Sequence, residues 1–415
     1  MNNLFCSSYM KYLRDEFYIG QSEIADSLYI SISTYSKMEQ GNKTIRNEDF
    51  EAVIRFYEHK KEGYSFCFEE EKKKQANALI RKCITAFEYR SQKDLVPELE
   101  TYLNDPSSLH SYAFFETKLI ETTYEYFTDQ EFQKRLPFLI QHMDLFDQTA
   151  RSFIYDLQGL SKLRAYDESA IDCFQSAKAL SVLIHIPGWL GLIDYHLIIT
   201  YLRAMLPHKA FPLFEESGRD FQNAGAHRRI LNLRFNQAQC LMKMKLYEEA
   251  DQIHLNLLQT YDQVDTKRFA AMIYVNFSWS QFIQKHYQEA INLSRKAVEL
   301  DYDFCDLYIT LAYSFYKLGE IPSALAAIEQ YKIQERTDDR SKMVLLFLEV
   351  LESFLLKKYE TFEHQAQQLV PKLAQWKDLE IDPFVYEMLI AHYKKTDNEH
   401  ALCPVLEKYI EYLKN

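Results

Sequence analysis

The chain has 415 residues, of which 47% are hydrophobic, and a formal net charge of −12 at pH 7. This length allows two or more domains, and the hydrophobic content excludes a mostly disordered chain. The negative charge is unusual for a protein that binds a polyanion such as DNA. Only nine glycines and ten prolines are present, which favours long helices joined by short loops. We therefore expect an all-α fold.

The sequence lacks the signals of several functional classes. No apolar run reaches the ~18 residues of a membrane-spanning helix, and the first residues lack the features of a signal peptide. The seven cysteines are scattered without CxxC or Cys/His spacing, which predicts buried thiols in a reducing compartment and no metal site. No phosphate-binding glycine loop, HExxH or GxSxG motif occurs. We expect a cytoplasmic protein that is not an enzyme and holds no cofactor.

Residues 20–43 have the polar and apolar pattern of two short helices that cross over one small core. Their buried faces would carry Ile24, Ala25, Leu28, Tyr35 and Met38. Ser31 is suited to cap the second helix and Gly41 to end it, so this helix would span roughly residues 32–40. Its outward side carries Ser33, Ser36 and Lys37. Short hydroxyls and a cation suit the base edges and phosphates of a major groove.

This segment resembles the Cro/repressor-type helix-turn-helix of bacterial and phage regulators over about residues 8–58. The residues in family register are Gln21, Glu23, Ile24, Ala25, Ile30, Ser31, Ser33, Thr34, Glu39, Gln40 and Gly41. The resemblance implies a double-stranded DNA operator as a partner. The implied contacts are a phosphate at Gln21, bases at Ile32, Ser33 and Lys37, and DNA backbone at Gln40 with Asn42 or Lys43. An internal ion pair between Arg14 and Glu39 is also implied.

Two residues depart from the family pattern. Tyr29 stands where the family usually has a glycine, and a left-handed backbone there would cost a non-glycine residue about 1–2 kcal/mol, so we expect a reshaped turn. Ile32 occupies a position that is often polar, where it could contact a thymine methyl group or weaken sequence reading. Residues 1–66 hold eight Lys/Arg against ten Asp/Glu, so DNA affinity must come from a local basic edge and from dimerisation. A degenerate copy that serves protein interaction or dimerisation is the alternative.

Residues 60–68, with Gly63 as the only strong helix breaker, predict a hinge. The run from Glu69 then starts a long helix with acidic residues at its positively charged end. The sequence is therefore divided into a helix-turn-helix domain over residues 1–60, a linker over 61–74 and a repeat domain over 75–415.

The rest of the chain repeats. Small residues recur at three equal intervals and then a shorter one, at Ala170, Ala210, Ala250, Ala290 and Ala324. The preceding helix carries Ala238, Ser278 or Ala312 where paired helices must approach closely. The pattern resembles the tetratricopeptide repeat, most clearly in LYITLAYSFYKLGEIPSALAAIEQY, over about residues 75–413. That resemblance implies roughly nine helix pairs stacked as a superhelical solenoid with an inner groove.

In such solenoids the first helix of each pair lines the concave side. Placing the alanines at a common phase gives these candidate peptide-binding residues: His196, Arg203, Asn232, Phe235, Asn236, Gln239, Lys243, Asn276, Trp279, Tyr313 and Lys317. Asn236 and Asn276 share one phase, and a carboxamide can donate to and accept from the backbone of an extended peptide. Arg203, Lys243 and Lys317 share another, which predicts a cationic strip for an acidic side chain or a C-terminal carboxylate. Scaffolding or intramolecular packing is the alternative role.

A helix-turn-helix joined to a tetratricopeptide solenoid resembles the peptide-pheromone receptors of Gram-positive bacteria and their phages, the group of Rgg, Rap, NprR, PlcR and PrgX regulators. This resemblance implies a cytoplasmic, homodimeric quorum-sensing transcriptional regulator. In it a re-imported short signalling peptide binds the groove and moves the paired DNA-reading domains. Two alternatives stay open: a regulator that sequesters or dephosphorylates a signalling protein, and a constitutive phage or plasmid repressor whose repeats only make dimers.

Overall fold

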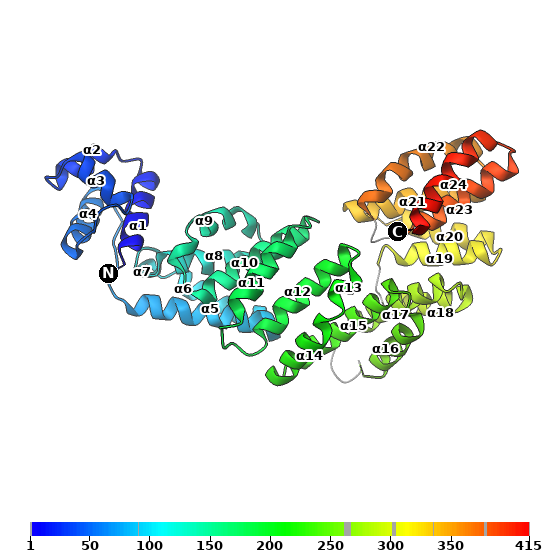
Figure 1. Ribbon diagram of the computed structural model, residues 1–415, viewed down its shortest axis with the longest axis horizontal. Coiled ribbons are helices and arrows are strands. Elements are labelled where there is room, and N and C mark those ends of the chain that lie inside the picture. The colour runs from blue at the N-terminus through cyan, green and yellow to red at the C-terminus, as the bar shows by residue number, and fades with distance from the viewer. Residues whose placement is uncertain are drawn as a thin grey trace. The chain divides into compact units, whose positions relative to one another are not determined.

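A computed structural model of the protein describes residues 2–89, 91–260, 267–300, 304–334, 336–376 and 380–414. Across these residues the chain is helical and forms no extended strand, and one isolated β-bridge joins Cys67 to Ser111. The expected all-α fold is confirmed (Figure 1). The chain divides into two compact units, one formed by Met1–Thr200 with Glu215–Arg229 and the other by Tyr201–Phe214 with Ile230–Asn415.

The first four helices form a small N-terminal domain, blue in Figure 1. They are α1 (Asn3–Phe17), α2 (Gln21–Ser27), α3 (Ile32–Glu39) and α4 (Asn47–Lys60). The Ser31 hydroxyl caps α3 by accepting a hydrogen bond from the backbone N–H of Thr34 at 3.1 Å. Gly41 follows α3 with φ 72°. The cap and the end of α3 are therefore those that the sequence predicts, and the predicted core residues are buried except for Leu28, which is partly exposed.

The turn between α2 and α3 keeps a left-handed residue at Tyr29, whose φ is 56°. The Tyr29 N–H donates to the carbonyl of Asp26 at 3.2 Å, and the Ile30 N–H donates to that of Ala25 at 3.0 Å. These are the two hydrogen bonds of a Schellman motif, which ends a helix with a left-handed residue. The expected reshaping of the turn is therefore wrong, because the two bonds hold the backbone and the Tyr29 ring, 97% exposed, needs no space in the core.

The segment 61–70 connects α4 to the next helix without helical structure of its own. Phe66 in this segment is 5% exposed, and its ring centroid lies 5.3 Å from that of Tyr9 and 5.4 Å from that of Tyr112. The residue after it donates its backbone N–H to the carbonyl of His110 at 2.8 Å. The segment thus packs on the N-terminal domain and also on the helices that follow it.

The helices after residue 70 follow one another as nine pairs within the described ranges, the number that the sequence predicts. The first four pairs are α5 (Glu71–Tyr89) with α6 (Gln92–Leu103), α8 (Phe114–Phe127) with α9 (Leu136–Gln141), α10 (Gln148–Arg164) with α11 (Ala170–Ser181), and α12 (Trp189–Arg203) with α14 (Leu213–Ala224). Short helices α7 (Pro106–Leu109) and α13 (Pro207–Ala210) lie in the connections, and two 3-10 turns, η1 (Phe132–Lys134) and η2 (Met143–Leu145), flank α9.

The second unit holds the other five pairs. They are α15 (His227–Lys243) with α16 (Tyr247–Thr260), α17 (Lys267–Ile283) with α18 (Tyr287–Glu299), α19 (Leu307–Lys317) with α20 (Ile321–Lys332), α21 (Asp339–Leu355) with α22 (Tyr359–Leu369), and α23 (Asp382–Lys395) with α24 (Glu399–Lys414). A 3-10 turn, η4 (Val370–Gln375), follows α22.

A left-handed residue marks the end of the first helix in eight of these pairs. The eight residues are Asp129, Tyr166, Met205, Lys245, Lys285, Gly319, Lys357 and Asp397, with φ between 50° and 79°. Each lies two residues beyond the end of its helix. In the α17–α18 turn the His286 N–H donates to the carbonyl of Gln281 at 2.9 Å, the long bond of a Schellman motif. The repeat is therefore marked by these left-handed residues as well as by the recurring small residues.

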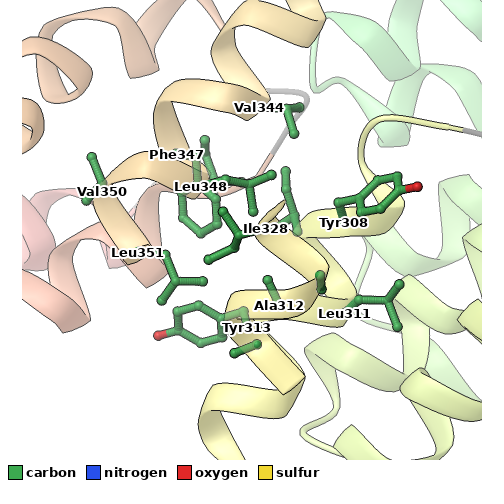
Figure 2. Close-up of a cluster of buried hydrophobic side chains, with 14 of the residues drawn as sticks. Tyr308, Leu311, Ala312, Tyr313, Ile328, Val344, Phe347, Leu348, Val350 and Leu351 are labelled. Carbon is green, nitrogen blue, oxygen red and sulfur yellow. The ribbon is translucent and has the colours of Figure 1, made fainter. Parts of the chain in front are cut away.

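The recurring small residues lie where helices meet. All eight of them, Ala170, Ala210, Ala250, Ala290, Ala324, Ala238, Ser278 and Ala312, are fully buried, as a close approach of paired helices requires. Figure 2 shows one such place, where α19, α20 and α21 share a core. Ala312 lies there among larger apolar side chains, including Ile328 and Leu351, and the ring of Tyr313 points into the same core.

Candidate functional site

Most of the predicted DNA-contacting residues lie on α3 and the loop after it. We call this set the reading surface, and it consists of Ile32, Ser33, Ser36, Lys37, Gln40, Asn42 and Lys43. Ile32 is 50% exposed, Ser36 is partly exposed, and the others are exposed. The Gln40 amide donates to the Ser36 hydroxyl at 3.3 Å, and the Asn42 amide donates to the Gln40 carbonyl oxygen at 3.2 Å. The chain itself therefore leaves this surface open to a ligand.

Glu39 fixes α3 to the two helices before it. Its side chain is 4% exposed and accepts a hydrogen bond from Nε of Arg14 at 2.8 Å, so the expected ion pair is present. The other carboxylate oxygen accepts from the amide of Gln21 at 2.7 Å. Gln21 was predicted to hold a phosphate, and in this arrangement only its second amide N–H is left for that role.

His196 belongs to the first unit, whereas the other predicted peptide-binding residues belong to the second. On α12 it is 6% exposed, and its Nδ1 lies 2.7 Å from Oδ1 of Asp156 on α10, which is fully buried. The sequence interpretation missed Asp156. Nothing in the local sequence marks it, because the pairing depends on the packing of two helices that are well separated along the chain.

The predicted amides of the second unit occupy equivalent places in successive pairs. Asn236 lies nine residues before the left-handed Lys245, and Asn276 lies nine residues before the left-handed Lys285. On α15, Asn232 and Asn236 are each 8% exposed, and Gln239 is partly exposed. The Nδ2 atom of Asn276 is buried and has no hydrogen-bond partner among the described residues. An unpaired buried donor is costly, so a side-chain movement that brought this amide to a carbonyl would be favourable.

Four residues of the predicted set contact the chain's own C-terminal part: Lys243, Trp279, Tyr313 and Lys317. Nζ of Lys243 lies 3.5 Å from Oε1 of Glu380, and Nε1 of Trp279 donates to the other oxygen of the same carboxylate at 3.3 Å. Glu380 precedes α23 and has a left-handed backbone, with φ 51°. One carboxylate therefore joins α15 to α17.

A second carboxylate, that of Glu387 on α23, is held in the same way. The hydroxyl of Tyr313 donates to its Oε2 at 3.1 Å, and Nζ of Lys317 lies 3.2 Å from the same atom. Burial and the neighbouring Glu387 raise the pKa of Tyr313 well above its ordinary value, so the hydroxyl stays protonated and donates. Tyr313 is 1% exposed.

Phe384 lies between these two carboxylates in the sequence and packs on the same face. Its ring centroid is 4.8 Å from that of Tyr313, 4.9 Å from that of Phe282 and 6.3 Å from that of Trp279. The sequence interpretation missed this contact because it followed the repeat only as far as α19. Phe384 precedes the left-handed Asp397 by the same spacing with which Asn232 precedes Lys245, so extending the phase would have found it.

Phe235 and Arg203 complete the predicted set. Phe235 packs on Phe269, with 6.0 Å between ring centroids, and Arg203 is exposed at the end of α12.

Among the residues that the structure describes, no group of three or more His, Cys, Asp or Glu side chains could hold a metal ion. None of the described helices is both long and apolar enough to cross a membrane.

Residues 227–303, which span α15 to α18, match the tetratricopeptide repeat family. None of the curated protein sequences matches this chain. The match to the repeat family covers the part of the second unit that carries most of the predicted amides.

Solved structures share the fold over most of the chain. The apo form of the quorum sensor NprR from B. thuringiensis is 14% identical, with a TM-score of 0.68 over 82% of this chain and 99% of NprR. NprR in complex with its cognate peptide NprX is 15% identical, with a TM-score of 0.62 over 82% of this chain and 98% of that one. Aspartyl phosphate phosphatase F from Bacillus subtilis is 16% identical, with a TM-score of 0.56 over 82% and 92%. The chain is thus an all-helical solenoid of tetratricopeptide type, similar in fold to these regulators.

Proposed function

We propose that this chain is a transcriptional regulator that binds double-stranded DNA through the reading surface. It acts as a homodimer, and a short signalling peptide bound by the second unit changes its affinity for DNA. The observation that carries the proposal is that the reading surface is exposed while the domain that bears it is packed firmly on the first helix pairs.

The chemistry of the reading surface supports DNA as a partner. Hydroxyls at Ser33 and Ser36 suit base edges, Lys37 suits a guanine or a phosphate, and Ile32 suits a thymine methyl group. The buried Glu39 carboxylate holds α3 in place, so these side chains are presented from a fixed helix. Because residues 1–66 carry a net charge of −2, affinity must come from the few cations on this surface and from two copies of the domain.

The amides of the second unit support a peptide as the ligand. A main-chain carbonyl of an extended peptide would satisfy the buried Nδ2 of Asn276, which the described chain leaves unpaired. Asn236, at the equivalent place one pair earlier, would continue the same line of contacts. The likeness in fold to NprR, whose structure holds a cognate peptide, points to the same class of ligand.

An aromatic cluster supplies the coupling between the DNA-reading domain and the solenoid. It consists of Phe5, Tyr9, Tyr12, Phe50, Phe66, Tyr112, Phe114 and Phe115. The rings of Tyr9 and Phe114 lie 4.9 Å apart and those of Phe5 and Phe115 5.7 Å apart, so α1 packs directly on α8. A change in the first helix pairs is therefore passed to α3. A peptide acts only by binding one arrangement better than another, and a coupling of about 1–3 kcal/mol suffices.

The test is selection of random duplex DNA by the full-length chain, followed by mobility shift at fixed salt. We expect one sequence to be enriched, and Lys37→Ala and Ser33→Ala to weaken its binding at least tenfold. Lys11→Ala is the matched control, because Lys11 lines a hollow between α1 and α9. Synthetic peptides encoded by small reading frames beside the gene are then added. Absence of any enriched sequence would reject the DNA-binding part.

A regulator of another signalling protein is the second candidate. It is favoured by the acidic balance of residues 1–66 and by the likeness in fold to a phosphatase of aspartyl phosphate. In that case the N-terminal domain would bind a protein and no duplex would be enriched. The third possibility, a constitutive repressor, predicts an enriched duplex whose binding no peptide alters.

A further inference from the structure

Three residues of the C-terminal part, Glu380, Phe384 and Glu387, contact the residues of the second unit that we propose bind a peptide. Glu380 contacts Lys243 and Trp279, and Glu387 contacts Tyr313 and Lys317. The groups that donate in these contacts come from α15, α17 and α19, three successive first helices, whereas the accepting carboxylates come from within eight residues of one segment. Residues 382–387 are the first turns of α23, so side chains from one short stretch of the chain meet three successive first helices.

The contacts have the chemistry of ligand recognition. Each carboxylate meets one ammonium group and one neutral donor, and the aromatic ring of Phe384 packs on an aromatic surface between them. A carboxylate held by a cation and a second donor is a common way to recognise an acidic group. The face thus has a defined preference for an acid, an aromatic side chain and a second acid.

The chain can exchange these internal contacts for contacts with water or with a ligand. The side chains of Glu380 and Glu387 are 28% and 37% exposed and that of Lys317 is 32% exposed, so water reaches these three charged groups, whereas Lys243 is 13% exposed and Tyr313 1%. Ion pairs at such exposure contribute little to stability. By contrast, Val385 and Met388 of the same helix are almost fully buried in the core of the second unit. The polar side of α23 can therefore be released while its apolar side stays packed.

The segment leaves one buried donor of this unit unsatisfied. It supplies no partner for Nδ2 of Asn276, which remains unpaired. A separate peptide with the same acidic and aromatic groups could make these contacts and also satisfy Asn276 with its main chain. Such a peptide has an advantage over the internal segment.

We propose that residues 380–387, EIDPFVYE, act as an internal competitor of the signalling peptide. The peptide carries an aromatic side chain between two carboxylates, and it binds by displacing Glu380, Phe384 and Glu387 from their contacts. This inference rests on the proposed peptide-binding function of the second unit. It adds the chemical class of the ligand and a built-in threshold, because a peptide must outcompete a segment that is always present.

The test uses a fluorescein-labelled octapeptide EIDPFVYE and the full-length chain, with binding followed by fluorescence anisotropy. The variant Glu380→Gln with Glu387→Gln keeps side-chain volume but weakens the internal contacts. We expect it to bind the octapeptide at least tenfold more tightly than the wild type. Adding Lys243→Gln and Lys317→Gln to that variant should reverse the gain. Glu399→Gln with Glu407→Gln removes the same charge from α24 and should leave the affinity at the wild-type value.

A second measurement needs no substitution. Hydrogen–deuterium exchange of the wild-type chain with excess octapeptide should rise at the start of the segment, in residues 380–382, because Glu380 loses its partners there while the buried side of α23 stays packed. The inference is wrong if the wild type and the Glu380→Gln, Glu387→Gln variant bind the octapeptide with equal affinity, or if neither binds it. Binding that leaves exchange in residues 380–382 unchanged would also overturn it. Because the octapeptide assay uses no DNA, its failure leaves the DNA-binding proposal standing, and failure of the DNA selection leaves this assay interpretable.

Discussion

The carboxylate of Glu39 lies 2.8 Å from Nε of Arg14, and only 4% of the Glu39 side chain is exposed. This single contact joins α3 to α1, and the amide of Gln21 adds α2 to the same carboxylate. The buried carboxylate of Glu39 therefore links α3, which carries most of the reading surface, to both α1 and α2.

Glu39→Ala should lower the free energy of unfolding of the N-terminal domain by about 2–3 kcal/mol, because it removes the buried carboxylate that Arg14 and Gln21 share and leaves Arg14 only its exposed partner Asp15. Hydrogen exchange of α1–α4 in the full-length chain measures this local stability. Glu48→Ala, at an exposed position in the first turn of α4, is the control and should cost less than about 1 kcal/mol. Equal effects of the two changes would contradict the structural role of Glu39.

Tyr29→Gly should stabilise the N-terminal domain. The left-handed backbone at Tyr29 costs a non-glycine residue about 1–2 kcal/mol, and the greater freedom of glycine in the unfolded chain returns about 0.5–1 kcal/mol of that. We expect a net gain of about 0.5–1 kcal/mol in the same exchange experiment. Tyr29→Ala is the matched control, because alanine keeps the strain and loses only a ring that is 97% exposed. A gain with alanine equal to that with glycine would show that strain is not the cause.

The helix-turn-helix and the repeats were predictable because their signals are local or periodic. Ser31 and Gly41 mark the ends of α3, and alanines recur where helices approach closely. The turn at Tyr29 was mispredicted because a steric rule for one residue was applied without the Schellman hydrogen bonds that outweigh it. The other left-handed turns were equally hidden, since among the eight that end first helices only Gly319 is a glycine.

The contacts of the predicted peptide-binding residues could not be read from the sequence. The phase of the repeat selected Lys243, Trp279, Tyr313 and Lys317 as candidates but gave no sign of what they contact. Their partners Glu380 and Glu387 lie 70 to 137 residues away in the sequence, and such long-range contacts leave no periodic trace. Buried pairs such as Asp156 with His196 were missed for the same reason.

Asn276→Leu should not destabilise the chain. Its Nδ2 is buried without a partner among the described residues, so replacing the amide by an apolar side chain of similar size removes a desolvation cost, and we expect a change between zero and a gain of about 1 kcal/mol. Urea unfolding measures this. The same change should weaken the octapeptide by at least tenfold in the Glu380→Gln, Glu387→Gln background. A large loss of stability would show that Asn276 serves the fold instead of a ligand.

His254 on α16 should make the second unit sensitive to acid. The ring is fully buried beside Phe277, with no partner for either nitrogen among the described residues, and burial lowers its pKa to about 4. The unfolded chain, with an ordinary pKa near ~6.5, takes up a proton in this window while the folded chain does not. Stability is therefore fully present above about pH 6.5 and falls as the pH drops toward 4, by up to about 3 kcal/mol.

The check is urea unfolding at pH 7 and at pH 4.5 for the wild type, His254→Leu and His364→Leu. The His254 variant should lose less stability between the two pH values than the wild type. His364 is exposed on α22, so its variant should follow the wild type. A wild-type pH dependence retained in His254→Leu would assign the effect to other groups.

Phe66→Ala should uncouple the N-terminal domain from the solenoid without unfolding either. The Phe66 ring is 5% exposed and lies 5.3 Å from Tyr9 on one side and 5.4 Å from Tyr112 on the other, so its removal leaves a cavity between the two parts of the first unit. Such a truncation costs about 3–5 kcal/mol of local stability. Limited proteolysis should then cleave residues 61–70 faster than in the wild type.

Phe68→Ala is the matched control for this change. Phe68 packs on Phe66, with 4.8 Å between ring centroids, but is 40% exposed, so its loss should leave cleavage close to the wild-type rate. If the aromatic cluster carries the signal, Phe66→Ala should keep DNA affinity within about threefold while abolishing the effect of the regulating peptide, because the reading surface is intact but no longer follows the first helix pairs. A peptide effect that survives in Phe66→Ala would place the coupling outside this cluster.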